Sequence, residues 1–211
     1  MESIIASDIK SFLFSNGLIS DHQFGFRPDH STLDMLLLLS QQLMEVLNAK
    51  QEIRAISIDT RRANDMVWNL ALLTKLSSGV QGNLQSWLAD FLSCCSQRVT
   101  LNGIVSSSLP IQAGVTHDSV LGPALFLVFI NDLSDSGNSF LYLFADDSTL
   151  CCTIYRPSDW QAGASSLSAD LDKIINWSNT WNMSFNPDKS YTLTMSLRKD
   201  CLEPLLPPST F

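Results

Sequence analysis

Two adjacent aspartates lie where one apolar segment ends and another begins. Asp146 and Asp147 separate the runs 140–144 and 148–154, which are rich in aromatic, Leu, Thr and Ile residues. Such runs are typical of strands, so the two aspartates are predicted at the turn of a β-hairpin. Asp is also an ordinary turn residue, and turn chemistry is the alternative interpretation of the pair. Two like charges held together at a tight bend repel each other, and a divalent cation relieves that repulsion.

A third carboxylate follows another predicted strand. Segment 54–59 alternates in character and ends at Asp59, which predicts a strand with the carboxylate at its C-terminal end. If this strand neighbours the hairpin, three carboxylates converge at one end of a sheet. Mg²⁺ prefers a few carboxylates together with substrate phosphates. Two such ions about 3.5–4 Å apart can activate a 3′-hydroxyl and stabilise a leaving pyrophosphate, so this constellation suits nucleotidyl transfer.

The rest of the chain predicts the elements that would position these residues. Apolar spacing predicts helices over 8–20, 32–48, 67–76, 83–95, 119–132 and 159–181. Asn102-Gly103 predicts a second hairpin, and 191–197 is predicted to be a closing strand. This order predicts an α+β domain, with helices packed on one face of a mostly antiparallel sheet.

The helix expected over 32–48 has both a start signal and an apolar stripe. Ser31 is a good N-cap residue, and Asp34 in the first turn favours the helix dipole. One face of this helix carries Leu33, Leu36, Leu37, Ser40, Leu43, Met44 and Leu47.

Composition limits the class of protein. With 211 residues, 45% of them hydrophobic and 16% charged, the chain is expected to be globular. The cysteines show no C-x-x-C pair, so reduced thiols and an intracellular location are expected. The longest apolar run, Val120 to Ile130, is interrupted by Gly122-Pro123, so a soluble protein without a membrane partner is expected. The net charge of −8 disfavours a large phosphate-binding surface.

Five blocks of sequence, in order, carry a family resemblance. They are Gln23-Phe-Gly-Phe-Arg27-Pro with Ser31-Thr32, Ser57-Ile-Asp59 with Ala63-Asn64-Asp65, Ser119 to Leu133, Phe144-Ala-Asp-Asp147, and Trp177 to Lys189. Together they resemble the reverse transcriptase domain of non-LTR (LINE-type) retrotransposons over about residues 8 to 192.

The resemblance implies a right-hand polymerase palm over 51–197. A remnant of the fingers with an entry helix is expected over 1–50, a Pro-rich irregular tail over 198–211, and no thumb. It implies RNA-templated DNA synthesis from an RNA template, a DNA primer and deoxynucleoside triphosphates. The implied cofactor is a pair of Mg²⁺ ions, for which Mn²⁺ can substitute.

The resemblance also implies the roles of individual residues. Asp59 and Asp146 would hold the metals, with Asp147 supporting them. Arg27 would lie near the incoming nucleotide or template, and Lys189 would protonate or steady the pyrophosphate. The alternative for Arg27 is a solvated loop cation, and for Lys189 an ordinary turn residue.

Two nucleotide-facing positions depart from the family pattern. Asn64 stands where the family usually has an aromatic residue that packs under the sugar. Thr116-His117-Asp118 stands where Pro-Gln-Gly is usual, so His117 would have to replace the glutamine as a hydrogen-bond donor, and Asp118 adds a negative charge. The expected chain is therefore a truncated and partly degenerate copy, without most of the fingers, the thumb, an endonuclease or a zinc knuckle.

Two hypotheses from different classes follow. The first is a reverse transcriptase domain that performs two-metal nucleotidyl transfer. The second is a catalytically inactive retroelement remnant that acts, if at all, as a binding or structural protein; the two departures and the net charge of −8 motivate it. The missing fingers, thumb and endonuclease segments would be needed for tight nucleic-acid binding. A metal-dependent phosphohydrolase has little support, because none of the three histidines lies in a recognisable general-base arrangement.

Overall fold

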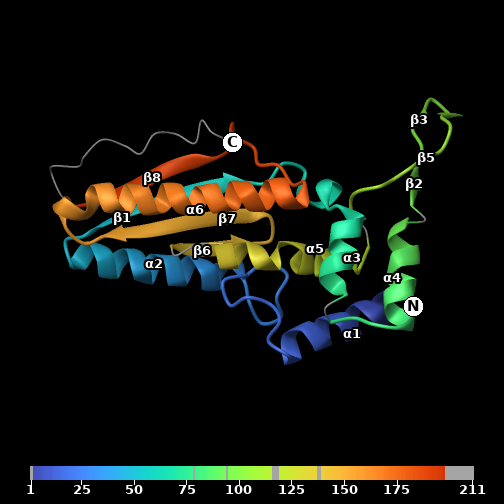
Figure 1. Cartoon of the computed structure of the whole chain (residues 1–211), viewed down its shortest axis with the longest axis horizontal. Helices are drawn as coiled ribbons and strands as arrows, with labels where there is room; N and C mark the ends of the chain where they lie inside the picture. Colours follow the sequence, from blue (N-terminus) through green and yellow to red (C-terminus); the bar gives the residue numbers. More distant parts are fainter. Residues whose placement is uncertain (1, 78, 94, 116–118, 137–138, 198–211) are drawn as a thin grey trace.

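A four-stranded antiparallel sheet lies at the centre of the fold (Figure 1). The computed structural model of the chain describes residues 2–77, 79–93, 95–115, 119–136 and 139–197. The strands follow the order β6 (Phe140–Phe144), β7 (Asp147–Ile154), β1 (Glu52–Asp59) and β8 (Tyr191–Ser196). The predicted strand ending at Asp59 and the predicted hairpin of 140–154 are therefore confirmed, and they are neighbours in the sheet.

The helices lie close to their predicted positions, with one exception. They are α1 (Glu2–Ser15), α2 (Thr32–Asn48), α3 (Asn69–Leu76), α4 (Asn83–Ser93), α5 (Gly122–Ile130) and α6 (Trp160–Trp181), with the 3-10 segments η1 (Ala63–Met66), η2 (Asn131–Ser136) and η3 (Pro157–Asp159). The exception is α1, which begins well before residue 8. The Glu2 carboxylate accepts hydrogen bonds from the Ser119 hydroxyl and the Leu121 N–H, which anchors the earlier start.

A second, smaller hairpin projects beyond the C-terminal end of α4 (Figure 1). Strands β3 (Thr100–Leu101) and β4 (Ile104–Val105) pair antiparallel around Asn102 and Gly103, whose φ angles are +50° and +80°. Strands β2 (Ser96–Gln97) and β5 (Leu109–Pro110) pair at its base. This pairing confirms the hairpin that the Asn-Gly sequence predicted. Asn and Gly favour it because they tolerate the positive φ values of a tight turn.

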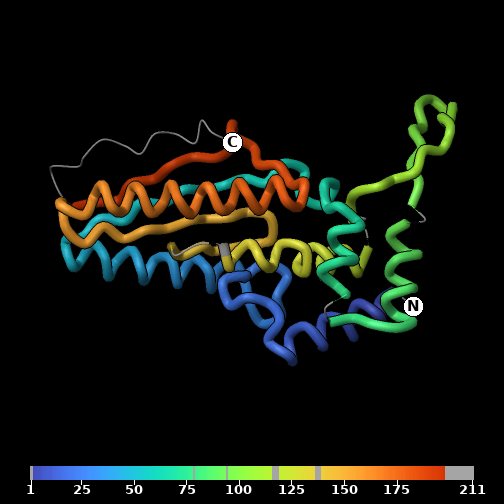
Figure 2. Tube along the Cα trace, in the orientation of Figure 1, coloured from blue at the N-terminus to red at the C-terminus, as the bar shows by residue number. Residues whose placement is uncertain are grey.

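Helices pack on both faces of the central sheet. Figures 1 and 2 show α6 and α2 running along the sheet with β7 drawn between them. On one face, Ile56, Ile58 and Leu150 join a core that includes residues of α3, α5 and α6. On the other face, Ile53 and Ala55 pack with Val46 of α2 in a smaller core. The α+β class and the antiparallel sheet are as predicted, whereas the prediction of helices on one face does not describe α2.

Helix α2 has the predicted bounds but packs by a different face. Ser31 and Asp34 form a reciprocal capping box, which confirms the predicted start. The predicted stripe, however, is mostly exposed: Leu33, Leu36, Leu37 and Met44 are 61%, 59%, 59% and 57% accessible. The helix faces the sheet with Met35, Leu39, Leu43 and Val46, of which Leu43 alone belongs to the predicted stripe. It carries apolar residues all round, so periodicity alone could not select the buried face.

No helix in the described ranges is both long enough and apolar enough to cross a bilayer. The tail 198–211 and the segment 116–118, which includes His117, lie outside the described residues.

Candidate active site

Strand pairing brings the three predicted carboxylates to one end of the sheet. In the antiparallel ladder between β1 and β7, Asp59 is the partner of Asp147. Directly opposed residues in such a ladder point to the same face, with Cβ atoms about 4.5–5.5 Å apart. Asp146 occupies the turn between β6 and β7, next to that pair. The convergence expected from the sequence is therefore present in the backbone.

Backbone hydrogen bonds fix both strand ends that carry these residues. The Thr60 hydroxyl donates to the Asp146 carbonyl oxygen at 3.0 Å, which ties the hairpin turn to the end of β1. The Asp59 N–H donates to Ser190 Oγ at 3.2 Å, and the Asn186 N–H donates to the Asp59 carbonyl oxygen at 2.8 Å. Asp59 is thus held between β7 on one side and the loop before β8 on the other.

A pocket of about 340 Å³ opens at this end of the sheet. Its polar lining comes from the end of β1, the segment η1, the hairpin turn and the loop before β8: Asp59, Thr60, Arg61, Arg62, Ala63, Asn64, Asp65, Asp146, Asn186 and Lys189. Two of the three predicted carboxylates line it, together with two of the four predicted nucleotide-binding residues, Asn64 and Lys189. Asp147 lies beside Asp59 in the ladder rather than in the lining.

The other two predicted nucleotide-binding residues are not part of this lining. Arg27 donates to Asp21 Oδ1 at 2.9 Å and to the Ser20 carbonyl oxygen at 3.1 Å, away from the pocket. His117 lies outside the described residues. The chain reaches that segment directly from the pocket wall, because the Val115 N–H donates to the Asn64 carbonyl oxygen at 2.8 Å.

Arg61 and Arg62 are exposed cations that line the pocket, and neither was among the predicted site residues. Arg62 has φ +47° at the start of η1, so the chain turns sharply there, after Thr60 has formed a bridge with Phe185. Two consecutive arginines within three positions of a strand-ending aspartate were the available signal. With Lys189 they place positive charge beside the carboxylates, as binding of a polyphosphate requires.

The charges at the site act on one another. Burial raises the pKa of Asp147 above its usual value, the negative charges of Asp146 and Asp59 raise it further, and Lys189 opposes the shift. The Lys189 Nζ lies 3.9 Å from Asp59 Oδ2, and its side chain is 68% exposed. An exposed pair of this length contributes little stability, so Lys189 is available to contact a ligand.

The carboxylates of this pocket suit a divalent cation, although they do not form a complete set of metal ligands. Among the described residues, no set of three or more His, Cys, Asp or Glu side chains lies close enough to hold a metal ion. Mg²⁺ does not need such a cage, because one or two carboxylates and substrate phosphates suffice for it. Asp59 and Asp146 line a single pocket and meet that requirement. The repulsion that raises the pKa of Asp147 is what a bound cation would relieve.

Replacing Asp147 by asparagine is expected to stabilise the metal-free fold at neutral pH. A carboxyl whose pKa is raised on folding holds its proton more tightly when folded, so stability falls as pH rises from the ordinary towards the raised pKa. Asn carries no such charge. The Tm of Asp147→Asn, measured in chelator, should exceed that of the wild type at about pH 7 and converge with it near pH 4. Asp90→Asn, an exposed position on α4, should show no such trend. A wild-type Tm advantage at neutral pH would contradict the electrostatic origin.

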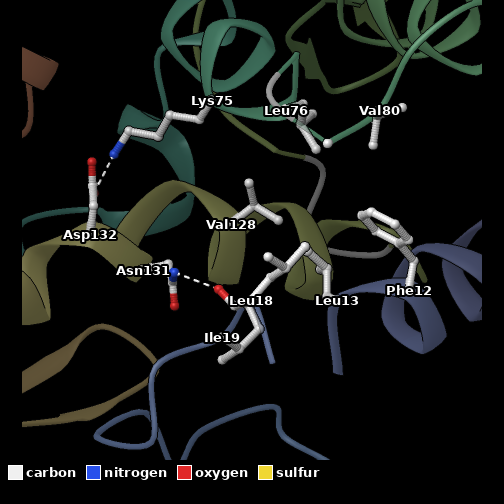
Figure 3. Close-up of a pocket in the computed structure, with 11 residues that line it drawn as sticks. Phe12, Leu13, Leu18, Ile19, Lys75, Leu76, Val80, Val128, Asn131 and Asp132 are labelled. Carbon is white, nitrogen blue, oxygen red and sulfur yellow. Dashed lines mark hydrogen bonds and ion pairs between the residues drawn. The ribbon is translucent and has the colours of Figure 1, made fainter. Parts of the chain in front are cut away.

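A second pocket, of about 270 Å³, lies between α1, α3 and α5 and shares no lining residue with the first (Figure 3). Its wall is mostly apolar, including Phe12, Leu13 and Val128. The polar groups at its end are already paired: Lys75 with Asp132, and the Asn131 amide with the Leu18 carbonyl oxygen. The carboxylate pocket is therefore the candidate site for chemistry.

Comparison with known sequences gives a family match over nearly the whole chain. Residues 1–202 match the family described as "Reverse transcriptase (RNA-dependent DNA polymerase)". The "Probable RNA-directed DNA polymerase from transposon X-element" of Drosophila melanogaster is 28% identical over 203 residues, covering 94% of this chain and 22% of that protein. The "RNA-directed DNA polymerase from mobile element jockey" of the same organism is 29% identical over 206 residues, with the same coverages. The chain thus spans about a fifth of the length of the curated relatives it matches.

Solved structures with a similar fold include telomerases. Apo telomerase from Candida tropicalis aligns with a TM-score of 0.64 at 9% identity, covering 95% of this chain and 37% of that one. Telomerase from Candida albicans, in complex with a fragment of telomeric RNA, aligns with a TM-score of 0.63 at 10% identity, covering 95% and 36%. At such low identity the likeness concerns the fold alone, and it confirms the polymerase-palm architecture predicted from the sequence.

Proposed function

The chain belongs to the reverse transcriptase (RNA-dependent DNA polymerase) family, and on that premise we propose that it is the palm-containing part of a retrotransposon enzyme that copies RNA into DNA. The observation that carries the proposal is the pairing of Asp59 with Asp147 beside Asp146, at the mouth of a polar pocket. The names of the Drosophila relatives, RNA-directed DNA polymerases of a transposon and of a mobile element, support the same activity.

Asp59 and Asp146 are the proposed metal-holding residues, with Asp147 in support. Both line the pocket, and the hydrogen bond from Thr60 to the Asp146 carbonyl oxygen keeps the two strand ends together. When bound, a pair of Mg²⁺ ions would supply activation of the primer 3′-hydroxyl and charge stabilisation of the leaving pyrophosphate, with Mn²⁺ as a substitute. Asp147, whose pKa is raised by burial and by its neighbours, adds negative charge that favours cation binding.

The cations of the pocket are the proposed triphosphate contacts. Arg61 and Arg62 follow Asp59 after Thr60, and the Lys189 Nζ lies 3.9 Å from Asp59 Oδ2. A guanidinium binds phosphate oxygens in a two-pronged geometry, whereas an ammonium acts as a mobile point charge. The arginines are therefore suited to orient the triphosphate, and Lys189 to neutralise the pyrophosphate as it leaves. Asn64, which also lines the pocket, is the proposed contact for the nucleotide sugar.

The proposed substrates are an RNA template, a DNA primer and deoxynucleoside triphosphates. The net charge of −8 means that the chain has little basic surface of its own to grip a duplex. Weak binding of primer and template, strengthened at low salt, is therefore expected from the chain by itself. Activity should be sought at high template concentration and low ionic strength.

The direct test is primer extension by the purified 211-residue chain. It should extend a DNA primer annealed to an RNA template when Mg²⁺ or Mn²⁺ and deoxynucleoside triphosphates are present, and chelator should stop the reaction. Arg61→Gln with Arg62→Gln should raise the KM for the nucleotide about tenfold or more, since charge-assisted phosphate contacts are lost. A folded protein that neither incorporates nucleotides nor binds them in the presence of Mg²⁺ would instead support the non-catalytic remnant.

A further inference from the structure

The segment 22–25, which precedes α2, runs along β6, the outer strand of the hairpin whose turn carries Asp146. Gln23 forms an isolated parallel bridge with Leu143 of β6. The Phe24 N–H donates to the Leu143 carbonyl oxygen at 2.8 Å, and the Leu143 N–H donates to the His22 carbonyl oxygen at 2.9 Å. β6 is otherwise an edge strand of the four-stranded sheet. Residues 22–25 therefore extend the sheet next to the turn that carries Asp146.

The Gln23 side chain is buried and bonded to that turn. It is 0% accessible, and its Oε1 accepts hydrogen bonds from the Gly25 N–H at 2.8 Å and from the Ala145 N–H at 3.1 Å. Its Nε2 has no hydrogen-bond partner within the described residues. A buried amide with an unpaired donor is costly and needs an explanation. The two accepted hydrogen bonds indicate that the Gln23 side chain acts through its carbonyl oxygen, which binds the Gly25 and Ala145 N–H groups.

Gly25 brings its backbone directly against the same turn. A Cβ atom at this position would lie 2.2 Å from the Ala145 nitrogen and 2.9 Å from the Phe144 carbonyl carbon. Only glycine permits such a close approach of two backbones. Gln23 and Gly25 thus meet the turn at one peptide unit, the one that joins Phe144 to Ala145, one residue before Asp146.

The turn is held in a conformation that its own sequence does not favour. Ala145 has φ +55°, a left-handed value that residues with a Cβ rarely adopt. Contacts on two sides keep it there: Gln23 and Gly25 at Ala145, and the Thr60 hydroxyl at the Asp146 carbonyl oxygen. Strained backbone persists only where the surroundings over-determine it, and it gathers at functional sites.

We propose that Gln23 and Gly25 are positioning residues that hold the strained Ala145 peptide and thereby set where the Asp146 carboxylate meets the metal. The inference rests on the proposed function and deepens it. Gln23 touches neither the pocket nor the carboxylates, and it acts through the backbone of the turn. This assigns a mechanical role to the glutamine and glycine of the 22–27 segment, distinct from any nucleotide contact by Arg27.

The test is Gln23→Met in the full-length chain, since Met fills a similar volume and accepts no strong hydrogen bond. The half-saturating Mg²⁺ concentration for primer extension should rise about tenfold or more, as when the outer partners of a metal ligand are removed. The rate at saturating Mg²⁺ should fall much less. Hydrogen exchange at the Ala145 amide should accelerate, while exchange at Leu150, within β7, stays protected.

A matched control is available at a different position on the same strand. Gln42 Oε1 accepts the Tyr142 hydroxyl at 3.0 Å, so Gln42→Met makes the same chemical change against β6 without touching the turn. It should leave the Mg²⁺ dependence unchanged. A folded Gln23→Met protein with wild-type Mg²⁺ dependence overturns the proposal. If Gln23→Met fails to fold, Gln23→Asn, which retains an amide with a shorter reach, takes its place with the same expectation, and failure of both to fold also overturns it.

The amide-exchange measurement separates this inference from the proposed function. If the wild type shows neither extension nor Mg²⁺-dependent stabilisation, the proposed function fails. The positioning role of Gln23 is then judged by whether Gln23→Met selectively accelerates hydrogen exchange at the Ala145 amide. Unchanged exchange at Ala145 rejects this role, and accelerated exchange confined to the turn supports it.

Discussion

Asp146→Asn is expected to lower primer extension at least about a thousandfold, and Asp59→Asn by a similar factor. Asn has the size and shape of Asp but lacks its charge, so the change removes a carboxylate proposed to hold the metal, with little effect on packing. A metal that contributes several kcal/mol of charge stabilisation accounts for a loss of about this size, because each 1.4 kcal/mol is worth a factor of ten. Single-nucleotide incorporation at saturating Mg²⁺ measures it.

Two comparisons make this result specific to the carboxylate site. Asp172→Asn removes a charge from an exposed position on α6, so it should retain wild-type incorporation. Mg²⁺ should raise the Tm of the wild type and of Asp172→Asn, but not that of Asp146→Asn or Asp59→Asn. Extension that survives Asp146→Asn at more than a few per cent of the wild-type rate would show that Asp146 does not hold the metal.

The parts of the site that the sequence predicted are those fixed by local pattern. The alternation of 54–59 fixes where β1 ends, and the two apolar runs around Asp146-Asp147 fix the hairpin. Placing these strands side by side was a conditional expectation, and the register that pairs Asp59 with Asp147 confirms it. Because strand ends and turns have strong sequence signals, the position of each carboxylate within its own element could be predicted, whereas their convergence depends on the strand pairing.

The remaining contacts depend on tertiary packing that no local pattern encodes. Gln23 looked like part of a polar loop, yet it is fully buried against a turn more than a hundred residues away. Arg27 is predicted to lie near the nucleotide or template, whereas its guanidinium donates to the Asp21 carboxylate and the Ser20 carbonyl oxygen. Arg61 and Arg62 line the pocket only because the chain reverses at Arg62, where φ is +47°.

Burial in the sheet could not be inferred from residue type either. Charged residues are almost never fully buried unless they are paired, yet Arg54 is completely buried and its partner Glu52 is 5% exposed. In α2 the mismatch runs the other way, since most of the predicted apolar stripe, including Leu33, Leu36 and Leu37, is exposed. In both elements the choice of face is made by what α2 and α6 cover, which is a property of the assembled fold.

Arg54→Met is expected to destabilise the protein by about 3–5 kcal/mol. Arg54 Nε donates to Glu52 Oε1 at 2.6 Å, with side-chain exposures of 0% and 5%, and its guanidinium lies 5.4 Å from the Trp160 ring centroid. Removing the cation leaves a buried carboxylate without this partner, which is the costly step. For a chain of this size the Tm should fall by roughly 6–20 °C.

The size of that loss depends on the stranded charge, and a second substitution at Glu52 tests this directly. Arg54→Met combined with Glu52→Leu removes both charges and fills the space with apolar groups, so the double variant should be more stable than Arg54→Met alone. Arg156→Met, the same change at an exposed position, should shift stability by less than about 0.5 kcal/mol. Urea denaturation of the wild type, Arg54→Met, Glu52→Leu and the double variant completes the double-mutant cycle, with Arg156→Met measured as the control. Equal losses for Arg54→Met and the double variant would mean that the packing of Arg54 against Trp160, and not its pairing with Glu52, stabilises this end of the sheet.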